Sequence, residues 1–254
     1  MERQKIRIKR KHAYVALVAI AAIAFIVLVT YFSYNKINTA QGAYFSGANY
    51  ALLNKSINGN FTVSAWVYYT RFNGTGIVLS EGVGENEHSS FYMGSGGEMP
   101  TKTVCGVFSN YDVGKGMTAG WRFASTEFVG TGKWVNIACR YNGTSIAIFI
   151  DGRFENSTST PYPVLNAKII EIGKRTSTFY QDNMPTMNPM TGFVADVQFY
   201  NTSLNNSDIK KIFNDGIDGA PISENVIFIP FNKSNMCLSF GSLCSIKMLS
   251  INMQ

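Results

Sequence analysis

One long polar loop carries the side chains that best match a ligand-binding set. The segment KRTSTFYQDNMPTMNPMTG, residues 174–192, separates two runs that read as strands. Long loops on a rigid scaffold commonly carry recognition. Aromatic rings can stack on the apolar face of a sugar, while amide and carboxylate groups bond its hydroxyls. The candidate carbohydrate-binding residues are therefore Phe179, Tyr180, Gln181, Asp182 and Asn183. The alternative is an exposed loop without a function.

Two acidic residues are candidate ligands for calcium. Asp182 lies in the same loop, and Asp196 lies in the run FVADVQFY. Calcium binds several oxygen ligands at once, and carboxylates supply many of them. The alternative for Asp196 is a buried position with hydrogen bonds to the backbone.

The groups that a hydrolase needs are not paired in this sequence. Glycoside hydrolases use two carboxylates that flank the scissile bond. Glu85 and Glu87 lie together in the stretch GVGENEHSS, where they read as solvated loop charges. His88 is the single histidine beyond residue 12, so no Ser-His-Asp or Cys-His arrangement is indicated. We therefore expect no enzymatic activity.

Four cysteines bear on compartment and on metal binding. They form no Cys-X-X-Cys pair and partner histidines are lacking, which argues against zinc. Outside the cell an even number of cysteines indicates disulfides. Cys237 and Cys244 flank a short segment that can turn back on itself, and we expect them to pair. Cys105 and Cys139 lie in predicted strands and either pair or remain buried thiols.

The amino terminus has the features of a membrane anchor. Six basic residues precede Ala13, and the next 20 residues carry no charge. A helix of that length rises about 30 Å, the thickness of the hydrocarbon core of a bilayer. Because cations favour the cytoplasmic side, we expect a cytoplasmic tip (1–12), a transmembrane helix (13–34), a linker (35–42) and an extracellular body. A cleaved secretory signal and a prepilin-type signal are alternatives, and both also export the body.

Charge and glycosylation signals agree with export. The formal charge of +6 is concentrated in the first twelve residues, so the remaining chain is close to neutral and does not suit nucleic acid. Eight Asn-X-Ser/Thr signals occur, of which Asn205 is better used as a helix cap. The predicted glycosylation sites are Asn54, Asn60, Asn73, Asn142, Asn156, Asn201 and Asn232.

The body reads as antiparallel β-structure. In KWVNIACRYNGTSIAIFIDGR, two alternating runs are joined by Asn142-Gly143 and closed by Asp151-Gly152. Asn-Gly favours a tight hairpin turn, so this stretch predicts two strands and the start of a third. Further strands are predicted at 61–69, 76–80, 89–94, 101–109, 119–125, 168–173 and 192–201. Ten or more short strands indicate a two-sheet sandwich or a barrel.

One helix interrupts the strands. Leu204, Ile209, Ile212 and Phe213 share a helical face, Asn205 can cap the start, and Gly216 can end it.

These segments resemble a known family. Four segments are similar to parts of laminin-G-like domains. The hairpin of those domains resembles GKWVNIACRYNGTSIAIFIDGR, and an early core strand resembles FTVSAWVYY. The opening strand pair resembles AYFSGANYALL, and the last strand with its helix resembles GFVADVQFYNTSLNNSDIKKIFNDG. The resemblance covers residues 43–222 and implies an all-β, two-sheet antiparallel jelly-roll sandwich of the concanavalin A type, outside the cell. The stretch GIDGAPI, residues 216–222, is similar to the tail of archaeal membrane-anchored surface proteins of this kind.

The carboxyl-terminal region, 223–254, departs from the family pattern. The apolar run 225–231 has the character of the strand that such domains often place before the opening pair. We expect it to fill that vacant edge, in its own domain or in a neighbouring molecule.

The function implied by the resemblance is binding. Members of the family bind glycans, proteins or calcium, or build extracellular structure. We expect a membrane-anchored extracellular binding or adhesion module whose leading ligand is carbohydrate and whose other partners are surface proteins. The alternative is a self-assembling surface subunit, such as a pilus-like filament with a prepilin-like helix.

Overall fold

The computed structural model describes residues 22–23, 42–57, 59–82, 90–97, 99–112, 117–160, 169–175, 189–217, 219–223, 226–229, 231, 238–239 and 246–250. The chain divides into two compact units, Met1–Ala40 and Gln41–Gln254. In the first unit, Ala22 and Ile23 are helical. The rest of the predicted transmembrane segment, 13–34, lies outside the described residues. Within the part of the chain that the structure describes, no helix combines the length and apolar character needed to cross a bilayer.

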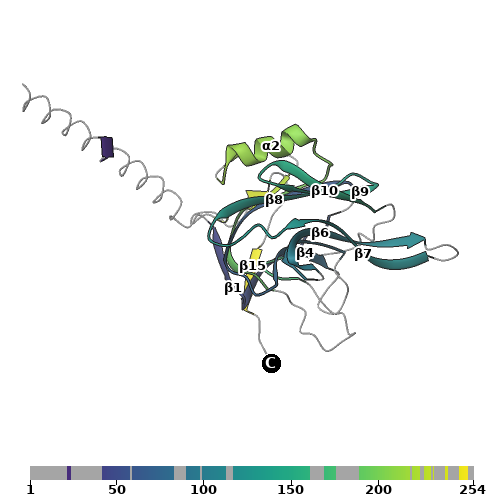
Figure 1. Ribbon diagram of the computed structural model, residues 1–254, viewed down its shortest axis with the longest axis horizontal. Helices are drawn as coiled ribbons and strands as arrows, with labels where there is room; N and C mark the ends of the chain where they lie inside the picture. Colours follow the sequence, from purple (N-terminus) through teal and green to yellow (C-terminus); the bar gives the residue numbers. More distant parts are fainter. Residues whose placement is uncertain are drawn as a thin grey trace, which may run out of the picture. The chain divides into compact units, whose positions relative to one another are not determined.

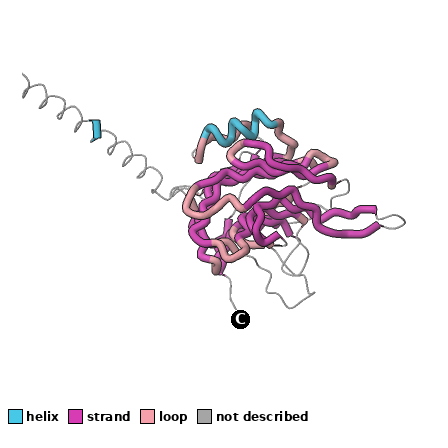
Figure 2. Tube along the Cα trace, viewed as in Figure 1, coloured by secondary structure: helices cyan, strands magenta, loops and turns pink. Residues whose placement is uncertain are grey.

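The second unit is a sandwich of two antiparallel sheets (Figure 1). Sheet A has the order β10 (Arg153–Ser159), β9 (Ser145–Ile150), β8 (Trp134–Tyr141), β3 (Phe61–Arg71), β12 (Thr191–Tyr200), β13 (Val226–Ile229), β14 (Leu238–Ser239), with β1 (Ala43–Ser46) also on β12. Sheet B has the order β15 (Ile246–Ser250), β2 (Asn49–Leu53), β11 (Ile169–Ile172), β4 (Gly76–Gly82), β5 (Phe91–Gly96), β6 (Met99–Asp112), β7 (Met117–Glu127). Helix α2 (Asn206–Asp215) lies over sheet A, and the two strand layers are seen in Figure 2. The predicted all-β jelly-roll sandwich with one short helix is confirmed.

The two closely spaced turn signals serve one meander. β8 pairs with β9 around Asn142-Gly143, and β9 pairs with β10 around Asp151-Gly152. The Asn142 Oδ1 atom accepts hydrogen bonds from the backbone nitrogens of Thr144 and Ser145, at 3.1 and 2.9 Å. Alternate residues of β8 and β9 are buried between the sheets, as their pattern predicts.

The opening strands separate instead of pairing with each other. β1 bonds to β12 in sheet A, whereas β2 bonds to β11 in sheet B. The segment similar to a strand pair is therefore a crossing point between the layers. A sequence cannot reveal this because both strands alternate in the same way.

One edge of β12 is shared by two strands. β1 pairs with Thr191–Val194, and β13 pairs with Val197–Tyr200, so the late apolar strand lies in its own domain. Between these two stretches, the register of β12 against β3, on its other edge, shifts from Ala195 to Gln198, and Asp196 there has φ of +50°. This extra residue is a β-bulge, which lets β12 face two partners along one edge.

Helix α2 begins and ends where its sequence predicts. The Asn205 Oδ1 atom accepts from the Asp208 backbone nitrogen at 2.9 Å, and Gly216 ends the helix with φ of +79°. Ile209 and Ile212 pack with Phe149 and Tyr200 on the outer face of sheet A.

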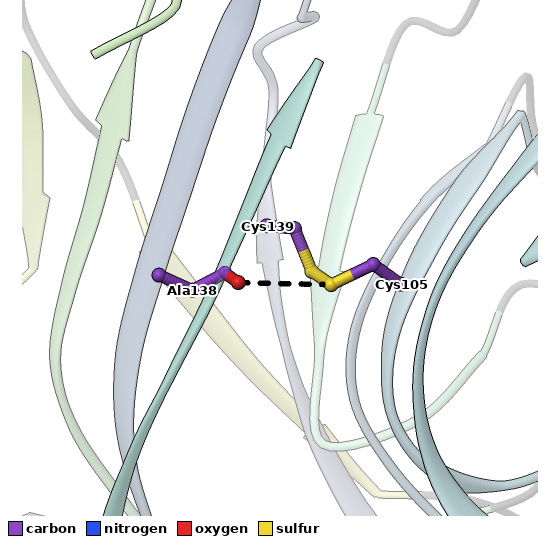
Figure 3. The surroundings of a disulfide bond; sticks show 3 residues. All are labelled: Cys105, Ala138 and Cys139. Atoms are coloured by element: carbon purple, nitrogen blue, oxygen red, sulfur yellow. Dashed lines mark hydrogen bonds between the residues drawn. A yellow bond between two sulfur atoms is a disulfide. The ribbon is translucent and has the colours of Figure 1, made fainter. Parts of the chain in front are cut away.

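A disulfide joins the two sheets. Cys105 of β6 and Cys139 of β8 are fully buried, with Cα atoms 5.7 Å apart (Figure 3). Of the two alternatives for these cysteines, pairing is what the structure shows. Cys237 and Cys244 lie outside the described residues, so their pairing stays a prediction.

Glu81 is a carboxylate buried in the core. It accepts hydrogen bonds from the Ile57 backbone nitrogen and, at 2.9 Å, from the Ser90 hydroxyl. Its side chain is fully buried beside Ile170 and Phe91. Burial raises the pKa of Glu81 to about 7, although both hydrogen bonds act in the opposite direction.

Replacing both Cys105 and Cys139 with alanine should lower the free energy of unfolding by about 3–4 kcal/mol. The bridge spans 34 residues of sequence and restricts the unfolded chain accordingly. Denaturant titrations of the variant and of reduced wild type measure the effect. The reduced wild type controls for the cavity that alanine leaves, and an unchanged midpoint in both would contradict the prediction.

Stability should fall as pH rises from about 5 to 8, by up to on the order of 3 kcal/mol. The folded pKa of Glu81 lies above its ordinary value of 4.5, so the folded state binds the proton more tightly. That contribution is present at low pH and is lost as pH rises through about 7. Denaturant titrations across this range measure it, and Glu81→Gln should flatten the profile. A slope that persists in the variant would assign the effect to other groups.

Candidate functional site

The outer face of sheet B carries a compact aromatic cluster. On β5, β6 and β7, alternate side chains point into the core and the others point outward. Tyr92, Gly106 and Phe123 stand opposite one another in neighbouring strands, and Phe108 stands opposite Trp121. Trp121 and Phe123 are half-buried, whereas Tyr92 beneath them is fully buried.

Gly106 lets two rings lie against the sheet. A Cβ atom at this position would lie 2.9 Å from Phe123 Cε1 and 3.1 Å from Tyr92 Cε1. The Phe123 ring therefore covers the strand backbone where any other residue would hold it away. The Trp121 ring is nearly parallel to it, with an interplanar angle of 11° and centroids 6.0 Å apart. We call these two residues the Trp121–Phe123 pair.

Residues 173–175 carry two cations across this face. β11 ends at Ile172, and Gly173 turns the chain with φ of +95°, where a Cβ would collide with the Phe45 ring. The Arg175 guanidinium carbon lies 4.5 Å from the Tyr92 centroid and 4.7 Å from that of Trp121. Cations favour the electron-rich faces of aromatic rings, so Arg175 holds this cluster in place.

A second contact fixes the same segment on its other side. Lys174 Nζ lies 3.8 Å from the Tyr50 centroid and 3.2 Å from a carboxylate oxygen of Glu171. The Ser80 hydroxyl donates to the Lys174 carbonyl oxygen at 3.3 Å. The face therefore combines rigid aromatic rings with positively charged groups already held by neighbours.

The carboxylates on the described part of this face are held in ion pairs. Among the described residues of this face, Glu171 is 4% exposed and ion-paired with Lys174, and the exposed Glu127 of β7 is ion-paired with Lys102. A glycoside hydrolase needs two carboxylates free to act on the bond between them. In the described part of the chain, no three His, Cys, Asp or Glu side chains gather to hold a metal.

The sequence-predicted loop residues 179–183 lie outside the described residues, so their ligand-binding role and the calcium role of Asp182 stay predictions. The two ends of that loop meet, because the Met190 backbone nitrogen donates to the Gly173 carbonyl oxygen at 2.9 Å. The loop therefore leaves the sandwich next to Arg175, at the margin of the aromatic cluster.

Asp196 lies inside the fold. It is fully buried at the bulge of β12, and the Gln198 Nε2 atom lies 3.0 Å from each of its carboxylate oxygens. The Gln198 Oε1 atom accepts from the Tyr200 hydroxyl, and burial raises the pKa of Tyr200 to about 12. Asp196 thus belongs to a buried polar chain, and its calcium role stays a prediction.

The glycosylation signals within the described residues are exposed. Asn156 differs from the others because its Nδ2 atom, to which a glycan would attach, donates to the Ser125 carbonyl oxygen at 3.1 Å. Asn232 lies outside the described residues. Glycosylation at all seven positions stays a prediction.

Trp121, Phe123 and Arg175 were not among the candidates that the sequence offered. The alternation in the predicted strand 119–125 could have identified the two rings as neighbours on one face. Nothing local to the sequence could have placed Gly106 opposite Phe123, or Arg175 over Trp121. The first depends on the register of the β6–β7 hairpin, and the second joins residues 54 positions apart in the chain (175 − 121).

Comparison with known proteins agrees with this architecture. The family model of the concanavalin A-like lectin/glucanases superfamily, Laminin_G_3, matches residues 40–210. A protein from Bacteroides ovatus ATCC 8483, provisionally described as carbohydrate binding, is similar in structure, with a TM-score of 0.52 and 14% identity over 84% of this chain and 61% of that chain. The chain thus spans about three fifths of that relative.

A native heptameric SAP-like pentraxin from Limulus polyphemus is also similar, with a TM-score of 0.50 and 14% identity over 83% of this chain and 94% of that chain. At 14% identity, the similarity to these two structures supports only the fold. No curated protein sequence matches the chain. Because the family model covers more than half of its residues, the chain belongs to the concanavalin A-like lectin/glucanases superfamily.

Proposed function

We propose that this protein is a non-catalytic carbohydrate-binding module displayed outside the cell and held there by its amino-terminal segment. Its binding surface is the Trp121–Phe123 pair on sheet B. The observation that carries the proposal is that these two half-buried rings lie nearly parallel, 11° apart, on a rigid sheet.

Parallel aromatic rings suit a sugar for an electrostatic reason. The face of an aromatic ring is electron-rich, and the C–H groups on one face of a pyranose carry a small positive charge. Neighbouring rings with a common orientation can receive consecutive parts of one ligand. The fully buried Tyr92, Ile77 and Val104 beneath them limit ring motion, which reduces the entropy lost on binding.

A binding role without catalysis fits the charges on this face. Glu171 is engaged by Lys174, and Glu81 points into the core. The provisional description of the Bacteroides ovatus relative as carbohydrate binding points in the same direction.

Export is supported by the disulfide and by the amino-terminal sequence. A buried disulfide between sheets is typical of oxidising compartments. The uncharged run that begins at Ala13 follows six basic residues, as in a signal anchor with a cytoplasmic tip.

Trp121→Ala should weaken glycan binding by about tenfold or more, because it removes a ring worth roughly 1.5 kcal/mol of stacking and burial. Phe123→Ala should act in the same direction. Binding of the full chain in detergent to printed linear oligosaccharides measures the effect. Phe154→Ala is the matched control, since that ring is 50% exposed on β10 of the other sheet. Equal binding by all three variants and wild type would refute the proposed surface.

The native protein should fractionate with membranes, and its body should be accessible from outside intact cells. The physical reason is the cost of removing an uncharged 20-residue run from lipid. Protease added to intact cells should cleave the body and leave the tip protected, as mass spectrometry of both fractions will show. An amino terminus that begins at Ala13 would instead favour the filament alternative.

A further inference from the structure

The outer face of sheet A carries four aromatic residues in register. Trp134 of β8, Tyr68 of β3, Phe193 of β12 and Tyr44 of β1 stand opposite one another across four adjacent strands. The ring centroids are 5.7 Å apart for Tyr68 and Trp134, 6.1 Å for Tyr68 and Phe193, and 5.0 Å for Tyr44 and Phe193. We call these residues the four-ring row.

The four-ring row faces solvent. Tyr44 is 48% exposed and the other three rings are half-buried, while their chain neighbours Phe45, Val67 and Val194 point into the core. Helix α2 covers the adjoining part of this face, where Phe213 stacks on Trp66 with centroids 5.6 Å apart. Exposed aromatic residues that gather in one patch mark binding surfaces more often than isolated ones do.

A pocket with both apolar and polar lining groups adjoins the row at the end of the same strands. Ser46, Thr191 and Arg71 stand opposite one another, two or three residues beyond Tyr44, Phe193 and Tyr68 along their chains. These residues line a pocket of about 260 Å³ together with Asn73 and Thr75. The lining offers hydroxyl, amide and guanidinium groups and contains no carboxylate.

The combination indicates the class of ligand. Apolar rings beside hydroxyl, amide and guanidinium groups suit a molecule that has apolar faces and many hydroxyls, which is the character of a sugar. Four strands at roughly 4.8 Å spacing make the row about 14 Å wide, so the ligand is elongated and crosses the strands.

We propose that the four-ring row and the pocket beside it form a second carbohydrate-binding site, for a linear oligosaccharide that lies across β8, β3, β12 and β1. Because sheets A and B pack through their inner faces, this site and the Trp121–Phe123 pair lie on opposite outer faces. One molecule then bridges two glycan chains, which raises its avidity for a glycan-rich surface. The second site does not depend on the first.

The test uses the full chain in detergent and a printed panel of linear hexaoses of β-1,4-linked glucose, N-acetylglucosamine, xylose and mannose. Tyr44→Ala, in a Trp121→Ala background, should weaken the remaining binding by about tenfold. Arg71→Met should weaken it too, and because Arg71 is exposed, this variant guards against a folding defect. Phe154→Ala in the same background is the matched control.

Each result decides the matter. Binding that survives in Trp121→Ala and is lost when Tyr44→Ala is added supports the second site. If Trp121→Ala also binds as well as wild type, the first site is refuted. Loss of all binding in Trp121→Ala overturns the second site and leaves the proposed function intact. Binding that Tyr44→Ala and Arg71→Met leave unchanged overturns it, and so does a panel on which no hexaose binds. A further measurement uses phosphatidylcholine vesicles with spin-labelled headgroups, which quench the fluorescence of tryptophan that contacts the membrane. Quenching that disappears in Trp134→Phe would assign the four-ring row to lipid and would also overturn the second carbohydrate site.

Discussion

Packing of the inner faces of sheets A and B against each other is the interaction on which the rest of this structure depends. Burying one large apolar side chain contributes about 1.5–3 kcal/mol, and many such residues meet between the sheets. Phe61 of sheet A, for example, contacts Phe91 of sheet B edge to face, with centroids 5.0 Å apart. The Cys105–Cys139 bridge crosses the same layer. Successive side chains of a strand point to opposite faces of its sheet. When every second side chain is buried in the core, the side chains between them lie on the outer face of each sheet.

The two outer faces are used differently. On sheet A, helix α2 covers one part and leaves the four-ring row beside it. On sheet B, the Arg175 guanidinium packs on Tyr92 and Trp121 and leaves the Trp121–Phe123 pair half-buried. Arg175 lies at the start of the long loop 174–192, so its contacts with Tyr92 and Trp121 also fix that end of the loop to sheet B.

Two carboxylates are fully buried in the described part of this fold, each with hydrogen-bond partners of its own. Asp196 and Gln198 lie at the bulge between β1 and β13, and Glu81 lies near the end of β4 beside Ile57. The Asp196 carboxylate accepts from the Gln198 amide, and the Glu81 carboxylate accepts from the Ile57 backbone nitrogen and the Ser90 hydroxyl, as buried polar groups require. A buried carboxylate with a raised pKa is then a consequence of topology and requires no catalytic role.

The sequence by itself determined the local structure of this protein. Alternation predicted the strands, Asn142-Gly143 predicted the hairpin, and Asn205 predicted the helix start, because each signal acts within a few residues. Only the tertiary structure decided that Cys105 pairs with Cys139, that β1 and β2 enter different sheets, and that residues 44, 68, 134 and 193 form one aromatic row. These outcomes depend on which strands become neighbours and in what register. That choice is made by packing summed over the whole core, and no short stretch of sequence records it.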